Sequence, residues 1–172
     1  MRITTVAGAR AARMFLLASA LTAFPAAAFA DSTSADLTVE ATVQANCTVS
    51  TSKLDFGTIN PLSGSNVNGS GGISVTCTNG TGWTASANIG IGSGASFSGR
   101  RLTSSTGTLT YNLFTDNTYA TVWGDGTGST GTMTGTGTGS AQSRTVYGRI
   151  GSGQTTARPG SYADTVSVTI SY

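Results

Sequence analysis

The chain has 172 residues, of which 9% are charged, 24 are glycine and none is histidine. The absence of histidine excludes the Ser–His–Asp and Cys–His arrangements of nucleophilic enzymes. The nine basic residues form no run longer than one arginine pair, so the sequence gives no electrostatic basis for nucleic-acid binding.

Residues 1–30 are predicted to be a signal peptide. Three arginines precede an apolar stretch over residues 14–24, and Ala28-Phe29-Ala30 matches a small-residue cleavage site. Cleavage near Ala30 would remove three of the nine basic residues, which leaves six against seven acidic residues and a net charge of −1. We therefore expect an exported protein with one domain, because the remaining chain is too short to bury two cores.

Residues 31–45 are predicted to form an N-terminal arm with the pattern of a β-strand. Over ten positions, polar residues alternate strictly with five apolar ones, which are Ala35, Leu37, Val39, Ala41 and Val43. Such alternation is typical of a strand with one buried and one wet face. The arm must either pair within its own domain or complete a neighbouring one, and the pattern leaves both possibilities open.

The two cysteines, Cys47 and Cys77, both follow the predicted signal peptide. In an oxidising compartment an even pair of cysteines predicts one disulfide. Each cysteine is in phase with apolar neighbours, so both side chains are expected to point into the core. A metal site is disfavoured because histidine and a second cysteine pair are missing, and no cofactor is expected.

Residues 46–172 are predicted to form an all-β domain. Runs of β-branched and aromatic residues recur between Gly, Asn and Ser clusters, and such spacing indicates a sandwich or barrel. The expected strands are Cys47–Ser50, Leu54–Ile59, Gly72–Thr78, Trp83–Ile91, Thr108–Thr115, Arg144–Ile150 and Thr165–Tyr172. In the last strand the residues expected to face inward are Val166, Val168, Ile170 and Tyr172.

Turn and loop residues separate these strands. Asn79-Gly80 predicts a tight turn. The low-complexity stretch Gly124–Ser140 is expected to be a flexible surface loop, with an irregular edge hairpin as the alternative. The pair Arg100-Arg101 is expected to be solvated at a loop.

No set of residues predicts catalysis. The domain's four carboxylates, Asp55, Asp116, Asp125 and Asp164, are each expected at solvated turns. Both tryptophans are expected in the core or an interface. The chain is therefore predicted not to be an enzyme.

Seven short stretches of the domain occur in a characteristic order. They are Asn46–Val49, Leu54–Ile59, Ile73–Cys77, Leu109–Asp116, Val122–Gly126, Val146–Ile150 and Pro159–Val166. Together they resemble the spore coat protein U family, whose members include subunits of archaic, Csu-type chaperone–usher pili.

The resemblance implies an incomplete immunoglobulin-like β-sandwich that is completed by a donor strand from another chain. A periplasmic pilus chaperone would supply that strand first, and at the outer-membrane usher the arm of a neighbouring pilus subunit would replace it. On this sequence the donor would be Ala35–Val43, and the acceptor groove would lie beside Thr165–Tyr172. The family's disulfide would be Cys47–Cys77.

The expected function is that of a secreted structural subunit of a chaperone–usher pilus or coat fibre, exported through the periplasm to the cell surface. Surface attachment and biofilm formation follow from the resemblance. Two alternatives remain, a self-complemented monomeric periplasmic or surface binding domain and a spore-coat component.

Overall fold

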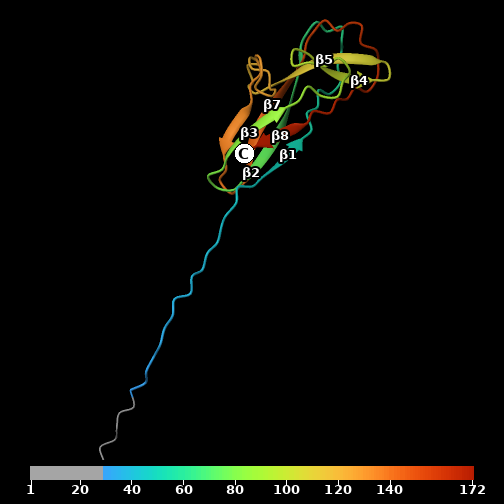
Figure 1. Ribbon diagram of the computed structural model, residues 1–172. Helices are drawn as coiled ribbons and strands as arrows, with labels where there is room; N and C mark the ends of the chain where they lie inside the picture. Colours follow the sequence, from blue (N-terminus) through green and yellow to red (C-terminus); the bar gives the residue numbers. More distant parts are fainter. Residues whose placement is uncertain (1–28) are drawn as a thin grey trace, which may run out of the picture. The chain divides into compact units, whose positions relative to one another are not determined.

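A computed structural model describes residues 29–172, and all the regular elements in that part are antiparallel strands (Figure 1). The strands are β1 (Cys47–Ser52), β2 (Val67–Cys77), β3 (Gly82–Ala87), β4 (Arg100–Ser104), β5 (Gly107–Phe114), β6 (Met133–Thr136), β7 (Gln142–Ile150) and β8 (Val168–Ser171). The all-β prediction is confirmed. Within residues 29–172 there is no helix long and apolar enough to cross a membrane.

The chain divides into two units, Met1–Glu40 and Ala41–Tyr172. In the first unit, residues 29–40 form no strand and are all exposed. The predicted signal peptide lies outside the described residues except for its last two positions.

The second unit contains two sheets. One sheet has five strands in the order β1-β2-β7-β5-β4, and the other has three in the order β6-β3-β8. Buried side chains from both sheets form one hydrophobic core, so the sheets pack face to face as a sandwich. The core residues include Val75 from β2, Trp83 from β3 and Ile150 from β7.

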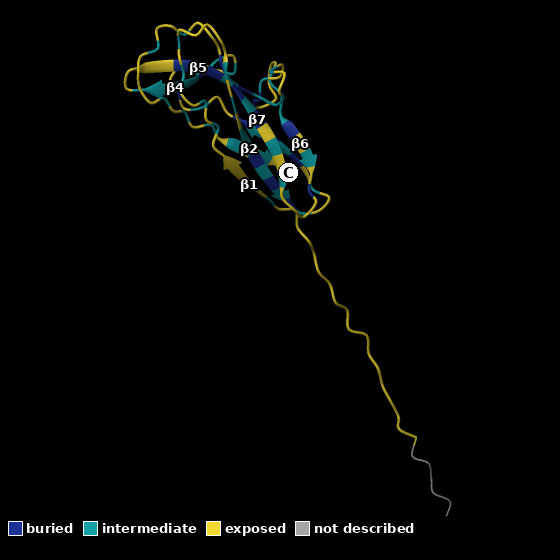
Figure 2. Cartoon of the chain, turned by 180° about the vertical axis from the view of Figure 1, so that it is seen from behind, coloured by how far each residue is buried: buried dark blue, intermediate teal, exposed yellow. Residues whose placement is uncertain are grey.

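The period-2 pattern of the sequence accounts for the central strands. In β2 the buried side chains Ile73, Val75 and Cys77 alternate with polar ones, and Figure 2 shows this alternation along the sheet. The predicted turn at Asn79-Gly80 is present, because Thr81 donates its backbone N–H to the carbonyl of Thr78 at 3.0 Å. Gly80 has a φ of 83°, which glycine adopts without a steric penalty.

Three predictions about individual segments are wrong. Leu54–Ile59 is not a strand, because it has no ladder partner among the described residues. The stretch Gly124–Ser140 is not only a loop, since it contains β6, which pairs with β3. A side chain at Gly135 of β6 would collide with the indole of Trp83, so glycine is needed where the strand crosses that ring.

The third wrong prediction concerns Arg100-Arg101, which lies in β4 and not in a solvated loop. The Arg100 side chain is fully buried. The β4 strand pairs with β5 through a two-residue connection between Ser104 and Gly107. β3 and β8 are also shorter than expected, as they end at Ala87 and begin at Val168 respectively.

Asp116 organises the loop that follows β5. Its carboxylate accepts hydrogen bonds from the Thr118 hydroxyl and from the backbone amides of Thr118, Ala120 and Thr121. These bonds, first the one from the Thr118 hydroxyl and then those from the Thr121 and Ala120 amides, lower the pKa of Asp116 to about 2.

Candidate functional site

A groove of about 890 Å³ lies along the sandwich between two chain segments that belong to no sheet ladder along most of their length. One wall is formed by residues 51–59 and the other by residues 157–168. The floor consists of side chains from the three strands β2, β5 and β7 and from the loop after β5. It includes Ile73, Tyr111, Leu113, Trp123 and Val146. An elongated groove with an apolar floor is suited to an extended apolar segment.

Glycines in the five-stranded sheet create the first wall. A side chain at Gly148 would approach Leu54 Cδ2 and Phe56 Cζ to 2.8 Å, and one at Gly71 would approach Leu54 Cβ to 3.0 Å. The segment after β1 therefore seats Leu54 and Phe56 directly on the backbone of the sheet. Phe56 also makes an edge-to-face contact with Tyr111, with ring centroids 6.0 Å apart.

Hydrogen bonds from a neighbouring loop hold the second wall. Ser167 exchanges two bonds with Asn88, since the backbone N–H of Asn88 donates to the Ser167 carbonyl and the Ser167 N–H donates to Asn88 Oδ1. Ala163 exchanges a pair of backbone bonds with Thr103. Between these bonded residues, the backbone N–H groups of Asp164 and Val166 donate to no partner within residues 29–172.

Asp164 ties this wall to the floor. Its carboxylate accepts the Tyr111 hydroxyl at 2.7 Å and the Ile91 backbone N–H at 2.9 Å. Burial, and then the hydrogen bond to Asp164, raise the pKa of Tyr111 well above its ordinary value. The phenol therefore stays protonated and donates throughout the physiological range.

The edges of both sheets meet this groove. β1 is the outermost strand of the five-stranded sheet, and β8 is the outermost strand of the three-stranded sheet. β1 buries neither of its faces beyond Cys47, as the exposed residues along it in Figure 2 show. An edge strand with open backbone groups is a template for pairing with another strand.

The four residues predicted for the acceptor strand occupy different positions. Val166 and Val168 line the groove. Ile170 is half-buried against the core, while Tyr172 is 60% exposed and is not part of the groove lining. The predicted alternation is present, because Ser167, Thr169 and Ser171 are exposed.

The apolar residues of the predicted donor arm are all exposed, and none lies in a strand. Ala35 and Ala41 are exposed, and Leu37, Val39 and Val43 have exposed fractions of 87%, 83% and 83%. Three large aliphatic side chains on one face of the arm are thus left in water. Their exposure is unfavourable unless a partner covers them.

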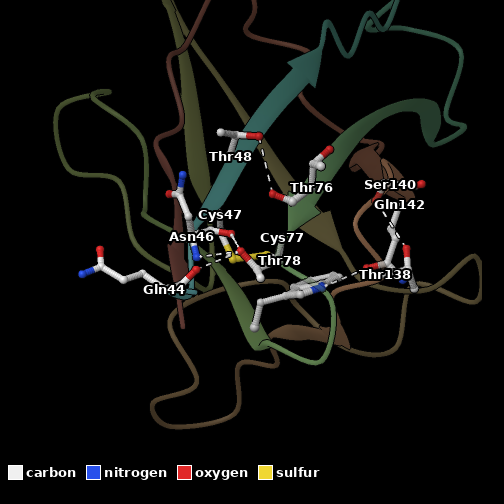
Figure 3. Close-up of a disulfide and its surroundings, with 11 residues drawn as sticks. Gln44, Asn46, Cys47, Thr48, Thr76, Cys77, Thr78, Thr138, Ser140 and Gln142 are labelled. Carbon is white, nitrogen blue, oxygen red and sulfur yellow. Dashed lines mark hydrogen bonds between the residues drawn. A yellow bond between two sulfur atoms is a disulfide. The ribbon is translucent and has the colours of Figure 1, made fainter. Parts of the chain in front are cut away.

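A disulfide fixes the point where the arm joins the sandwich. Cys47 and Cys77 face each other in the register of β1 and β2, with their Cα atoms 4.1 Å apart (Figure 3). The predicted disulfide is therefore confirmed. The Cys77 side chain is buried in the core, as the apolar phase of its strand predicts.

Sequence reasoning missed the buried Arg100. Its guanidinium donates to the carbonyl oxygens of Asn88 and Trp123 and to Asn112 Oδ1, at 2.7–3.0 Å. Burial lowers its pKa from the ordinary value. The signal that could have found it is its period-2 phase with Leu102, which packs against the core. Arg100 holds the loops beneath the second wall and does not line the groove.

The site holds no arrangement suited to catalysis or metal binding within residues 29–172. No group of three or more metal-ligating side chains occurs there. Both oxygens of Asp164 accept hydrogen bonds from the protein, and Asp55 forms an ion pair with Lys53 at 2.7 Å.

Comparisons with known proteins give one solved structure of similar fold and one matching family model. No curated protein matches the sequence. A solved structure that is similar is the CsuC–CsuE chaperone–tip adhesion subunit pre-assembly complex from the archaic chaperone–usher Csu pili of Acinetobacter baumannii, with a TM-score of 0.54 and 24% identity. The match covers 76% of this chain but only 40% of that chain, so the likeness establishes the fold alone.

The family comparison covers most of the chain. The model of the Spore Coat Protein U domain matches residues 33–169, which include nearly all of the predicted arm as well as the sandwich. The chain therefore belongs to the Spore Coat Protein U domain family.

Proposed function

We propose that this protein is a structural subunit of a secreted fibre, a chaperone–usher pilus, and that it assembles by donor-strand complementation. The observation that carries the proposal is the joint presence, in one chain, of an open groove with an apolar floor and an exposed strand-like arm. The role is structural and not enzymatic.

The arm and the groove match in length and chemistry. Ala35–Val43 and the wall at residues 51–59 each have nine residues, about 30 Å of extended chain. An arm seated between the walls would bond to both unpaired edges, and its five apolar side chains would cover the floor. Main-chain bonds give such a joint its affinity, and alternate side chains give it register.

The free energy gained by seating the arm in a groove is large enough to hold neighbouring subunits together. Burying Leu37, Val39 and Val43, which are almost fully exposed, contributes roughly 1.5–3 kcal/mol for each side chain. The two alanines add less. Ordering the arm offsets part of a gross gain on the order of 5–10 kcal/mol.

The joint also explains why the product is a fibre. The arm of one copy enters the groove of the next, so each subunit uses two different surfaces. A head-to-tail contact of this kind propagates and does not close into a dimer.

The partners and location follow from this role. A periplasmic chaperone would cover the groove before assembly, an outer-membrane usher would exchange it for a neighbour's arm, and the signal peptide at residues 1–30 would direct export. The similarity to a chaperone–subunit complex supports the chaperone. Attachment and biofilm formation are the proposed uses of the fibre at the cell surface. The family's name supports a spore-coat component as a second candidate.

The test compares the mature chain with a variant that lacks residues 31–44. Each is produced with its cognate chaperone, and the size of the assemblies is measured by light scattering. The full chain should form polymers, while the shortened chain should stop at the chaperone complex. Polymers of unchanged length without the arm would refute the proposal.

A further inference from the structure

We propose that the outer face of the five-stranded sheet carries a binding site for a carboxylate-bearing saccharide, namely an acidic polysaccharide. The site is centred on Arg149 of β7 and includes the aromatic ring of Tyr119. Binding there requires neither the arm nor the groove, because neither residue lines the groove.

Arg149 lies on the outer face because the side chains of β7 alternate. Val146 and Ile150 are buried in the core, so Tyr147 and Arg149 point to the other side of the sheet. β7 is paired with β2 along one edge and with β5 along the other. Its backbone groups are thus used within the sheet, and a ligand on this face is recognised by side chains and not by strand addition.

The guanidinium of Arg149 is fixed in place while two of its nitrogens have no protein partner. Its Cζ atom lies 3.5 Å from the centroid of the Tyr119 ring, and its Nε donates to Asn68 Oδ1 at 3.0 Å. Within residues 29–172 its two Nη groups donate to no acceptor, and no carboxylate forms an ion pair with it. A fixed guanidinium fork whose charge is not neutralised matches the two oxygens of a carboxylate.

Aromatic and small polar side chains surround this cation. The Tyr119 ring meets those of Phe114 and Tyr147 edge to face, with centroids 5.4 and 6.3 Å apart. All three rings are half-buried, so part of their surface stays in water. Asn68 and Ser70 of β2 are exposed beside them and offer an amide and a hydroxyl. This combination suits a sugar ring, because its C–H faces are apolar and its rim carries hydroxyl groups.

The backbone at Tyr119 is an independent observation in favour of a binding role. Within residues 29–172 it is the one non-glycine residue with a positive φ, at 60°. That conformation is unfavourable for an aromatic residue, and backbone strain of this kind concentrates at binding sites. The Asp116 carboxylate holds the loop in this conformation, since it accepts the backbone N–H groups of residues 118, 120 and 121.

The test measures binding of pentagalacturonate to the mature full-length chain by calorimetry. The fully methyl-esterified pentamer is the uncharged reference, and pentaglutamate is the acidic peptide reference. Arg149→Gln removes the charge, and Tyr119→Gly removes the ring at a position whose φ glycine adopts freely. The matched control is Arg144→Gln, the same change of charge on the same strand. Arg144 shares the phase of the buried residues, and its Cζ atom lies 5.4 Å from the centroid of the Trp83 ring. Thermal melting verifies that each variant is folded.

We expect Arg149→Gln to weaken binding of pentagalacturonate about ten- to a hundredfold, the effect of losing a charge-assisted contact to both carboxylate oxygens. Arg149→Lys keeps the charge and should restore only part of the affinity, because an ammonium group lacks the planar fork. Tyr119→Gly should weaken binding about two- to tenfold through the loss of aromatic contact. The control should change the affinity by less than about twofold, as expected for a charge on the other face of the sheet.

Three outcomes overturn the inference. The first is no binding of pentagalacturonate to the unmodified chain, and the second is an equal loss of affinity in Arg149→Gln and Arg144→Gln. The third is equal or tighter binding of the methyl ester or of pentaglutamate. Failure of the proposed function looks different, because it is seen in the size of assemblies with and without residues 31–44, which this measurement does not vary.

Discussion

Leu37 offers the most direct test of how the arm binds. The side chain is 87% exposed in the isolated chain, so seating it in a groove removes nearly all of its surface from water. Leu37→Ala deletes three carbon atoms, and at about 0.8 kcal/mol for each buried carbon the loss is about 2–3 kcal/mol. The dissociation constant should therefore rise roughly thirty- to a hundredfold.

The assay measures binding of a peptide with the sequence of residues 31–46 to a chain that lacks residues 31–44, by calorimetry or competition. Thr38→Ala in the same peptide is the matched control, because its side chain belongs to the polar face of the alternation and should change affinity by less than about threefold. Equal effects of the two substitutions would refute the assignment of an inward and an outward face.

Three further predictions concern the sandwich itself. Replacing Cys47 and Cys77 together by alanine removes a bridge with a sequence separation of 30, and should lower the free energy of unfolding by about 3–4 kcal/mol in urea titrations. Arg100→Met removes the hydrogen bonds of the guanidinium to the Asn88 and Trp123 carbonyls and to Asn112 Oδ1, and should cost on the order of 3 kcal/mol in the same titration, whereas Arg101→Met should cost about 1 kcal/mol or less. The pKa of Asp116 lies below its ordinary value of 3.8, at about 2, so its contribution to stability is complete above pH 4 and disappears as the pH falls toward 2. The difference in unfolding free energy between the native chain and Asp116→Asn should shrink over that interval, and a constant difference would contradict the assignment.

The strands with strict alternation could be predicted from the sequence because each has one buried face. β5 and β7 lie where the pattern of apolar residues places them, whereas β2 begins five residues before the predicted Gly72. The two cysteines are joined as their even number predicted. In these places the local pattern and the tertiary packing agree, which is why reasoning from the pattern succeeds.

Two strands, β4 and β6, were not predicted, because their pairing partners decide whether they form. β6 consists of glycine and threonine positions with little apolar signal, and it exists because β3 offers an edge and Gly135 makes room for Trp83. The segment Leu54–Ile59 has the alternation of a strand but has no ladder partner on either side. Its side chains pack on glycines that lie far away in the sequence.

The groove shows the same limit of sequence reasoning. Val166 and Val168, which the alternation of the last strand predicted to face inward, line the groove. The hydrogen bonds that Asp164 accepts from Tyr111 and Ile91 could not be predicted, because they join residues far apart in the sequence. Arg100 was missed because a charged residue beside a second arginine is usually solvated. Only its four hydrogen bonds in the folded chain explain its burial.

Hydrogen exchange at the two walls of the groove tests the central claim, that a strand from another chain completes this sandwich. The chain without residues 31–44 is measured alone and with the peptide of residues 31–46. We predict that the backbone amides of Phe56, Asp164 and Val166, which donate no hydrogen bond within the described chain, exchange quickly in the chain alone and become protected together when the peptide binds. Peptide binding with no new protection in either wall, or full protection before the peptide is added, would contradict it.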